Sequence, residues 1–396
     1  MKKTVLVLAI VMTMAFSDGY SQNRTIQFID KPWAELLAQA KKENKLIFMD
    51  GYASWCGPCK WMSANMFTND SIADFYNKSF ICAHFDMEKG EGVDLRKTYK
   101  VRAYPSLLFI NSDGEMVHEQ VGAPQKVQNY IDLGLTALNP EECLAAYNRK
   151  YNSGNYSPEF IAKYIPKLAS AYIPFDDILK KYFATQSDKD MFSRNNWNII
   201  FLGVNDYASP QFDFLLKHQK EYSNLYTKDS VSQKIGDVYL NALMTESRRA
   251  RSDSGYNALR KTVLESGYKD AEKTVFYADL LFYQTRGNRE KFLELACKDL
   301  DKYYHDDYNM LNNIAWSVYS IAKDPKDIEK ALSWVKRSIE IKSEPFNNDT
   351  YAALLFKQGK KEEAIKYERI AIDLAKAQKI SSTEYEDALK KMEAKN

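Results

Sequence analysis

The sequence predicts an α/β domain with a mixed sheet covered by helices, followed by an all-helical repeat domain. First, strand-type and helix-type patterns alternate over residues 22–138 of the 396-residue chain. Second, no convincing strand pattern follows Asn139-Pro140, and helical patterns rich in Tyr, Leu, Ala and Lys continue to the end. Third, two similar segments near the C-terminus align Ala331 with Ala364, 33 positions apart, which is typical of helical repeats.

The first 21 residues have the features of a secretory signal peptide. Lys2 and Lys3 form a basic start, and Thr4 to Phe16 is an uncharged apolar run. A run this short does not cross a membrane as a helix, which takes about 20 residues. Small residues allow cleavage after Ser17 or Ser21. We therefore expect a periplasmic or otherwise exported protein from which the signal peptide is cleaved; the alternative is a retained N-terminal anchor helix.

Residues 22–138 contain a regular succession of strand and helix patterns. Leu46 to Asp50 is an apolar run of the buried-strand type, whereas Trp33 to Lys42 places its apolar residues on one helical face. The Asn111-Ser-Asp-Gly114 link predicts a hairpin between the last two strands. The predicted strands are Thr25–Ile29, Leu46–Asp50, Phe80–Phe85, Ser106–Ile110 and Met116–Gln120. The predicted helices are Trp33–Lys42, Cys59 to about Tyr76, Val93–Tyr99 and Val127–Leu138.

Residues 139–396 are predicted to form the all-helical domain. Besides the alignment of Ala331 with Ala364, Gly359 lies five residues before Ala364 and Ala371 lies seven after it. This pattern over about residues 310–377 resembles tetratricopeptide repeats, whose period is 34 residues. The resemblance implies helix pairs that approach closely at small residues and a solenoid whose concave face receives a partner.

The charge balance gives no sign of a protein that binds nucleic acid or a membrane surface. There are 55 basic and 53 acidic residues, a formal charge of +2, and no segment gathers a basic field. The five cysteines leave at least one thiol unpaired within the chain. They are Cys56, Cys59, Cys82, Cys143 and Cys297. The four histidines are scattered and there is no second Cys-x-x-Cys pair, so we predict no metal site.

The pair Cys56 and Cys59 follows a buried-type strand and opens a helix. Free backbone N–H groups and the helix dipole at a helix start favour a thiolate. We therefore expect Cys56 at the exposed end of the helix as the attacking nucleophile, and Cys59, one turn further in, as the resolving thiol. The alternatives are a zinc site and an inert disulfide staple; a loop of four residues constrains little of the unfolded chain.

The segment Trp55-Cys-Gly-Pro-Cys-Lys60 closely resembles the active site of the thioredoxin superfamily, and the resemblance covers about residues 25–138. It implies a thioredoxin-like fold and dithiol redox activity without a cofactor. It also implies that Trp55, Gly57 and Pro58 contact the substrate beside the cysteines. A Gly-Pro pair between the cysteines is typical of reducing members, so the resemblance favours a reductase that a membrane electron donor keeps reduced.

Two further positions match the family. Asp50, six residues before Cys56, occupies the place of an Asp that lies beneath the second cysteine and transfers its proton. Burial is expected to raise its pKa toward the working pH; the alternative is an Asp that only hydrogen-bonds a turn. Val101-Arg-Ala-Tyr-Pro105-Ser106 matches the family's cis-proline loop. The resemblance implies a cis bond between Tyr104 and Pro105, with the backbone of Tyr104 free to pair with a substrate peptide; the alternative is an ordinary trans bond.

The chain also departs from the family's pattern. Cytosolic thioredoxins carry a Lys near the buried Asp on the adjoining strand, where this chain offers Cys82 and His84. Ala103 and Tyr104 replace a common Gly and Ile. We expect Cys82 to be a buried thiol rather than a redox partner, because free Cys is among the most buried residue types.

The sequence thus predicts an exported thiol–disulfide oxidoreductase that reduces disulfide-containing exported proteins through a Cys56–Cys59 dithiol–disulfide cycle. The helical domain is expected to present substrates or partners. Two alternatives stay open at this point. One is a tetratricopeptide-type interaction scaffold with secondary redox activity, and the other is a disulfide isomerase or oxidase.

Overall fold

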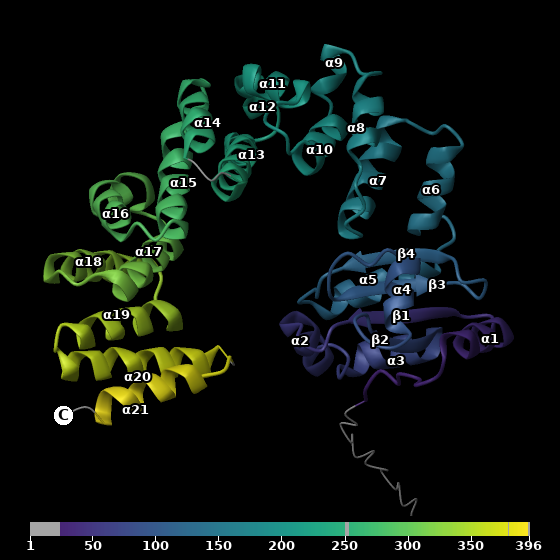
Figure 1. The fold of residues 1–396 in the computed structure, drawn as a ribbon, viewed down its shortest axis with the longest axis horizontal. Coiled ribbons are helices and arrows are strands. Elements are labelled where there is room, and N and C mark those ends of the chain that lie inside the picture. The colour runs from purple at the N-terminus through teal and green to yellow at the C-terminus, as the bar shows by residue number, and fades with distance from the viewer. Residues whose placement is uncertain (1–23, 250–252, 379, 395–396) are drawn as a thin grey trace, which may run out of the picture. The chain divides into compact units, whose positions relative to one another are not determined.

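The computed structural model describes residues 24–249, 253–378 and 380–394, and it divides into two compact units, Met1–Gly203 and Val204–Asn396 (Figure 1). The predicted signal peptide, residues 1–21, lies outside the described residues. None of the helices in the described ranges is long and apolar enough to cross a membrane.

A mixed four-stranded sheet forms the centre of the first unit. Its strands are β1 (Leu46–Tyr52), β2 (Phe80–Asp86), β3 (Ser106–Ile110) and β4 (Met116–Val121), in the order β2-β1-β3-β4. β1 pairs with β2 in parallel, and the other two pairings are antiparallel. Asn111 to Gly114 form the turn between β3 and β4, with the Gly114 N–H donating to the Asn111 carbonyl. The predicted α/β class with a mixed sheet is therefore confirmed.

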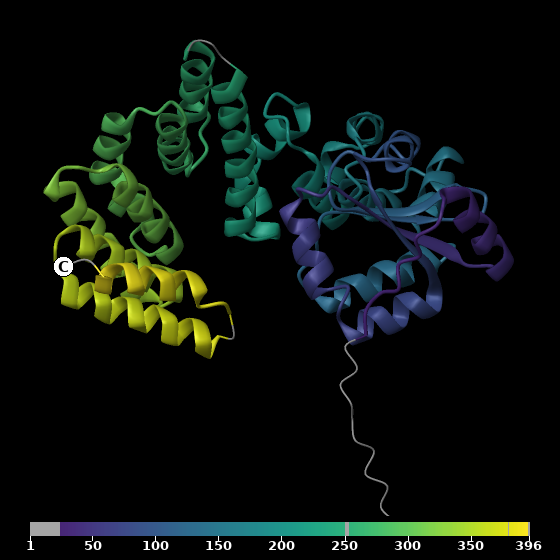
Figure 2. The same cartoon turned by 60° about the horizontal axis from the view of Figure 1, so that its bottom comes forward.

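Helices lie on both sides of this sheet (Figure 1; Figure 2). They are α1 (Trp33–Glu43), α2 (Gly57–Asn65), α3 (Asp70–Ser79), α4 (Gly92–Thr98) and α5 (Val127–Leu138). Residues from α2, α3 and α5 pack with Phe48 and Phe109 in one apolar cluster. Residues from α1 and α4 pack with Met49 and Leu108 in another. Because side chains alternate along a strand, β1 and β3 supply buried residues to both clusters.

Two predicted elements differ from the structure. Residues 25–29 form no strand; they run beside β2 with a single ladder-like bond, from the Ile29 N–H to the Cys82 carbonyl at 2.8 Å. The helix predicted from Cys59 to Tyr76 is two helices, α2 and α3. The break occurs because the Asn69 side chain accepts the N–H groups of Ser71 and Ile72 and so begins a new helix.

Five more helices complete the first unit. They are α6 (Leu144–Asn152), α7 (Pro158–Ser170), α8 (Asp176–Phe183), α9 (Asp188–Met191) and α10 (Arg194–Gly203). α6 and α7 pack against the edge strand β4. The Leu144 N–H, at the start of α6, donates to Nδ1 of the buried His118 at 3.2 Å. The domain boundary predicted at residue 138 therefore falls inside this compact unit.

The described part of the second unit contains helices and no strands. They are α11 (Pro210–Lys217), α12 (Gln219–Leu225), α13 (Lys228–Arg249), α14 (Ser254–Glu265), α15 (Ala271–Thr285), α16 (Arg289–Tyr304), α17 (Tyr308–Ile321), α18 (Pro325–Ile341), α19 (Pro345–Lys357), α20 (Lys361–Ala377) and α21 (Thr383–Ala394). α17 packs on α18, and α19 packs on α20. Ala331, Ala364 and Ala371 are fully buried, as small residues between close helices are. The long helical region is confirmed, while its likeness to tetratricopeptide repeats stays a prediction.

Candidate functional site

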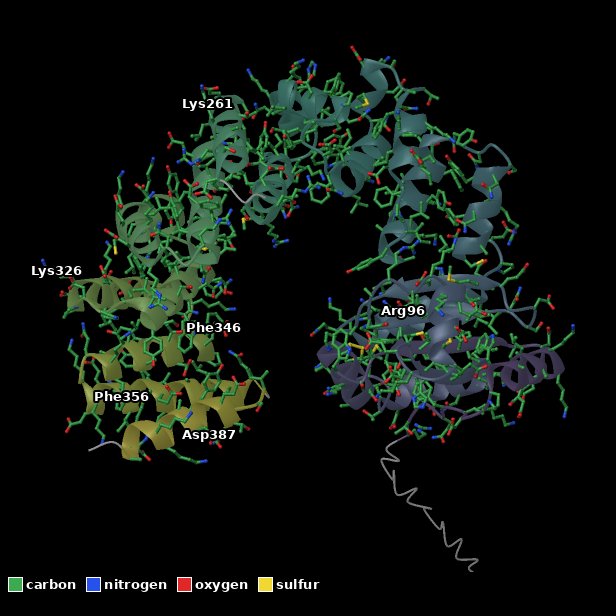
Figure 3. All side chains as sticks on the ribbon, viewed as in Figure 1. Arg96, Lys261, Lys326, Phe346, Phe356 and Asp387 are labelled. Atoms are coloured by element: carbon green, nitrogen blue, oxygen red, sulfur yellow. A yellow bond between two sulfur atoms is a disulfide. The ribbon has the colours of Figure 1, made fainter. Side chains whose placement is uncertain are left out.

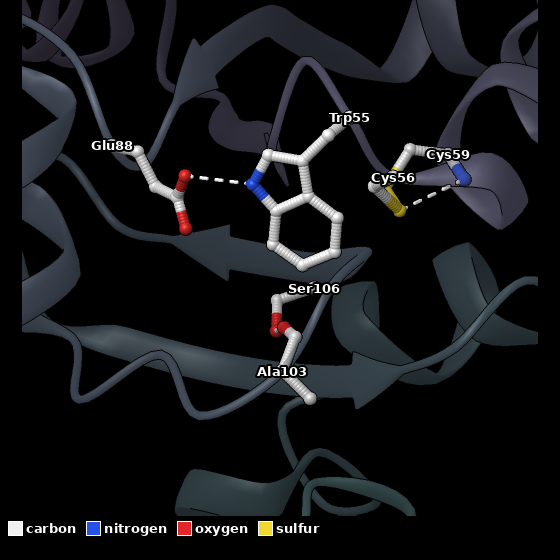
Figure 4. Close-up of a disulfide and its surroundings, with 6 residues drawn as sticks. All are labelled: Trp55, Cys56, Cys59, Glu88, Ala103 and Ser106. Carbon is white, nitrogen blue, oxygen red and sulfur yellow. Dashed lines mark hydrogen bonds between the residues drawn. A yellow bond between two sulfur atoms is a disulfide. The ribbon is translucent and has the colours of Figure 1, made fainter.

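Cys56 and Cys59 form a disulfide at the start of α2 (Figure 4). Cys56 is the N-cap residue of this helix, and its sulfur accepts the Cys59 N–H at 3.1 Å. The first turn of α2 contains no acidic residue that would repel a thiolate. Since an N–H donor and the positive end of the helix dipole both face the Cys56 sulfur, the helix start stabilises negative charge on Cys56 once the disulfide is reduced.

The exposure of the two cysteines differs from the expectation. The sequence predicts an exposed Cys56 and a shielded Cys59, yet the two residues are 3% and 5% exposed, respectively. The difference arises because Cys56 packs with Ala53 and Tyr104 at the site. Gly57 and Pro58, between the cysteines, are exposed instead. In the disulfide form, the hydrogen bond at the helix start distinguishes Cys56 from Cys59, and exposure does not.

Asp50 lies near the end of β1, six residues before Cys56. Its residue is 5% exposed, and its Oδ1 has no hydrogen-bond partner among the described residues. Burial raises the pKa of the Asp50 carboxyl from 3.8 to about 7. A carboxyl that is half ionised near neutral pH takes up and releases a proton with little driving force in either direction, as a general base requires.

The loop that precedes β3 faces the disulfide. The peptide bond between Tyr104 and Pro105 is cis. The Tyr104 side chain packs against the cluster of Ala53, Cys56 and Cys59. Pro105 is buried, whereas Tyr104 is half-buried. The residues predicted from the motif and those predicted from the loop are therefore brought together, although 45 positions separate Pro105 from Lys60.

Trp55 covers one side of the site. It is 67% exposed, and its indole packs edge-on to the Tyr104 ring with 6.0 Å between ring centroids. The indole N–H donates to Oε2 of Glu88 at 2.8 Å (Figure 4). Arg96, labelled in Figure 3, belongs to α4, and its guanidinium lies 5.7 Å from the centre of the Tyr104 ring. An exposed aromatic side chain whose orientation is fixed by a hydrogen bond offers a firm surface for a substrate segment.

Sequence reasoning missed Glu88 and Arg96. Both belong to the segment that follows β2, and neither is part of a recognisable motif. The register of β1 with β2 brings the segment to the site, because Tyr52 pairs with Asp86 immediately before it. A sequence-based search would find them only by asking which charged residues follow the strand that pairs with β1.

The other three cysteines are free thiols. Cys82 and Cys143 are buried, and Cys297 is half-buried. Burial raises the pKa of Cys82 to about 12, so its thiol is protonated and a poor nucleophile at neutral pH. Across residues 24–249, 253–378 and 380–394, no group of three or more His, Cys, Asp or Glu side chains is arranged to hold a metal ion.

Comparison with known proteins agrees with this geometry. The thioredoxin family model matches residues 25–132. Thioredoxin-1 of Drosophila melanogaster is 38% identical over 89 residues, which are 22% of this chain and 78% of that protein. The chain belongs to the thioredoxin family. Thioredoxin H4 of Arabidopsis thaliana is also 38% identical, over 23% of this chain and 71% of its own length.

A solved structure titled a putative disulphide-isomerase from Bacteroides thetaiotaomicron is 45% identical, covering 29% of this chain and 97% of that one, with a TM-score of 0.27. The thioredoxin match at residues 25–132 contains the disulfide, Asp50, Tyr104 and Pro105. It ends within α5, so the helices from α6 onward lie outside the matched residues.

Proposed function

We propose that this protein is an exported thiol–disulfide oxidoreductase that reduces disulfides in other exported proteins. The observation that carries the proposal is the Cys56–Cys59 disulfide at the start of α2, six residues after the buried carboxyl of Asp50. Membership of the thioredoxin family supports the same chemistry. The apolar segment at the N-terminus supports export.

The reaction begins with the reduced protein. The Cys56 thiolate attacks one sulfur of the substrate disulfide, which breaks that bond and forms a mixed disulfide between Cys56 and the substrate. The other substrate sulfur leaves with the electron pair and takes a proton. The N–H of Cys59 supports the first step, because it is aimed at the Cys56 sulfur and stabilises the attacking thiolate.

The second step releases the substrate. Asp50 takes the proton of the Cys59 thiol, and the Cys59 sulfur attacks the Cys56 sulfur. The mixed disulfide breaks, the second substrate sulfur leaves with the electron pair and takes a proton from solvent, and the Cys56–Cys59 disulfide forms. The substrate has then gained two electrons and two protons. A dithiol on a membrane electron donor restores the reduced pair by the same exchange in reverse.

Substrate recognition is assigned to the groups that surround the disulfide. Trp55, Gly57 and Pro58 form one side, and the Tyr104-Pro105 loop forms the other. An extended substrate segment would pair with the free backbone of Tyr104, as an added strand does. The helical second unit would contribute recognition of the partner protein, on a repeat surface of the kind that solenoids present.

A turnover assay tests the proposal. With dithiothreitol as reductant, the protein should accelerate the reduction of insulin disulfides, and the Cys56→Ser variant should not. An interaction scaffold with only secondary redox activity would bind partners without this turnover. An isomerase would instead restore activity to a scrambled disulfide protein better than it reduces insulin, and an oxidase would form disulfides in a reduced substrate.

A further inference from the structure

His84 lies directly opposite Asp50 in the parallel pairing of β1 and β2. Paired residues of parallel neighbours point to the same face of a sheet, and the strands are ~4.8 Å apart. Cys82, the other candidate beside Asp50, is paired with Phe48 instead. His84 is therefore the residue of β2 that lies opposite Asp50, on the same face of the sheet.

Aromatic contacts fix the imidazole of His84 in place. It stacks on the Phe28 ring, with 4.8 Å between ring centroids and 7° between ring planes. The Tyr52 ring lies 5.8 Å away by the same measure. The residues of β2 before His84 are buried, whereas His84 itself is exposed. The imidazole thus borders the buried end of β1 on one side and solvent on the other.

The proposed reaction requires a route by which a proton can leave Asp50 for solvent. Asp50 receives a proton from Cys59 in each cycle, but Asp50 is only 5% exposed and its Oδ1 has no partner in the described part of the chain. Two phenols lie near Asp50, those of Tyr52 and Tyr130. Burial raises the pKa of each phenol above 10, so both stay protonated at neutral pH and cannot accept this proton.

The remaining charged groups around the imidazole favour His84. Asp30, on the segment beside β2, raises the pKa of His84, while burial lowers it by more, so the net shift is downward. Asp86, two residues further along β2, is paired with Lys89. His84 is consequently a neutral acceptor at neutral pH, and a histidine exchanges its proton with solvent readily in this range.

We propose that His84 is a positioning residue that passes the proton between Asp50 and solvent while the substrate is released. The inference rests on the proposed function and adds a step to it. As Cys59 attacks Cys56, the Cys59 proton moves to the Asp50 carboxylate and the electron pair of the broken disulfide moves to the substrate sulfur. The proton on Asp50 then passes to His84, through a bridging water, and from His84 to solvent, so that Asp50 is ionised again.

Steady-state turnover of the full-length protein tests this role, because Asp50 must be ionised again before each new cycle. His84→Phe keeps an aromatic ring against Phe28 but cannot carry a proton, and His84→Ala leaves room for a small molecule. We expect both variants to slow steady-state reduction of a disulfide substrate about tenfold in dilute buffer, less than the loss of a direct general base, which costs about 10²–10⁴-fold. Added imidazole should restore the rate of His84→Ala, and His305→Asn, an exposed histidine of the second unit, should behave as wild type.

The first step gives an internal control. Attack of Cys56 on substrate, measured in a Cys59→Ser background, should not change with His84→Phe, and His84→Phe should add nothing to Asp50→Asn. Wild-type rates in both His84 variants, or a loss that imidazole does not restore, would overturn the role of His84. Absence of turnover in the wild-type protein would instead overturn the proposed function.

Discussion

At the scale of single residues, the helix start distinguishes two cysteines that are almost equally buried. Only the Cys56 sulfur accepts the N–H of Cys59 at the first turn of α2. This asymmetry predicts different roles in the mixed-disulfide cycle, with Cys56 as the nucleophile and Cys59 as the resolving thiol.

Serine variants separate these roles. Cys56→Ser should abolish turnover, because serine supplies no thiolate for the first attack. Cys59→Ser should form mixed disulfides with substrate and accumulate them, because the resolving sulfur is gone. Non-reducing electrophoresis after incubation with a disulfide substrate measures the trapped species. Equal trapping by the two variants would contradict the assignment.

The raised pKa of Asp50 implies that this residue lowers the stability of the protein at the pH at which it supports activity. Its pKa is about 7 in the folded protein against 3.8 for an ordinary Asp, so it stabilises the protein below pH 3.8 and this contribution is lost as pH rises through 7. At pH 8, Asp50→Asn should therefore raise the free energy of unfolding of the oxidised protein, by up to about 4 kcal/mol. Below pH 4 the two proteins should be about equally stable.

The same substitution should slow substrate release, because an amide cannot take the Cys59 proton. Urea denaturation at pH 4 and pH 8 measures the stability, and single-turnover release across pH 6–8 measures the rate. An Asp that only hydrogen-bonds a turn would show the reverse, with lower stability in Asp50→Asn and an unchanged release rate.

The sequence could identify those site residues that belong to a local motif, but not those that reach the site through strand pairing. The motif at Cys56 and Cys59 and the matching loop at Pro105 identified the site, because both have strong local patterns. Glu88 and Arg96 could not be found in this way, since only the pairing of β1 with β2 brings them to Trp55 and Tyr104. The same pairing, and no local pattern, decides that His84 rather than Cys82 lies opposite Asp50.

At the scale of elements, two differences from expectation have local causes. The Asn69 side chain begins α3 and so divides a stretch whose apolar spacing is compatible with one long helix. Residues 25–29 have a strand-type pattern but make too few ladder bonds with β2 to form a strand. Periodicity reports which face is buried, whereas caps and pairing partners decide where an element begins and ends.

The contact between β4 and α6 predicts a response to acid. Burial, together with the charge of Lys167, lowers the pKa of His118 to about 4, and its Nδ1 accepts the Leu144 N–H. A histidine with a lowered folded pKa stabilises the protein above pH 6.5, and this contribution is lost as pH falls through 4. Between pH 6.5 and pH 4, the free energy of unfolding of the wild-type protein should therefore fall by up to about 3 kcal/mol more than that of His118→Asn.

Denaturation of both proteins at pH 7, 5 and 4 checks this expectation. The difference between them isolates His118, because the other titrating groups are common to both. Parallel stability curves for the two proteins from pH 7 to pH 4 would show that the β4–α6 contact does not depend on neutral His118.

At the scale of the whole molecule, the residues of the candidate site occupy a shorter stretch of the chain than the first compact unit. Cys56, Cys59, Asp50 and Pro105 all lie before residue 138, but the first unit runs to Gly203 because α6 and α7 pack on β4. The alternating patterns before residue 138 revealed the α/β part, whereas nothing in the helical patterns after it distinguished helices that pack on the sheet from those of the second unit.

Two fragments test the division of labour. Residues 22–138 should fold and reduce a small disulfide, and residues 22–203 should do the same with higher stability, because α6 and α7 cover β4 and His118. Both should lose affinity for a physiological protein partner, which we assign to the second unit. A folded but inactive 22–138 fragment, as judged by circular dichroism and turnover, would mean that the later helices complete the site.

If Cys56 and Cys59 form a reducing dithiol–disulfide couple, an equilibrium titration of the full-length protein will reveal its reduction potential. The fraction of oxidised pair would be measured by thiol trapping in defined mixtures of reduced and oxidised glutathione or dithiothreitol. We expect one reversible two-electron transition near the potential of thioredoxin, about −270 mV. A transition near the −120 mV of a strong oxidant, or a disulfide that none of these mixtures reduces, would contradict it.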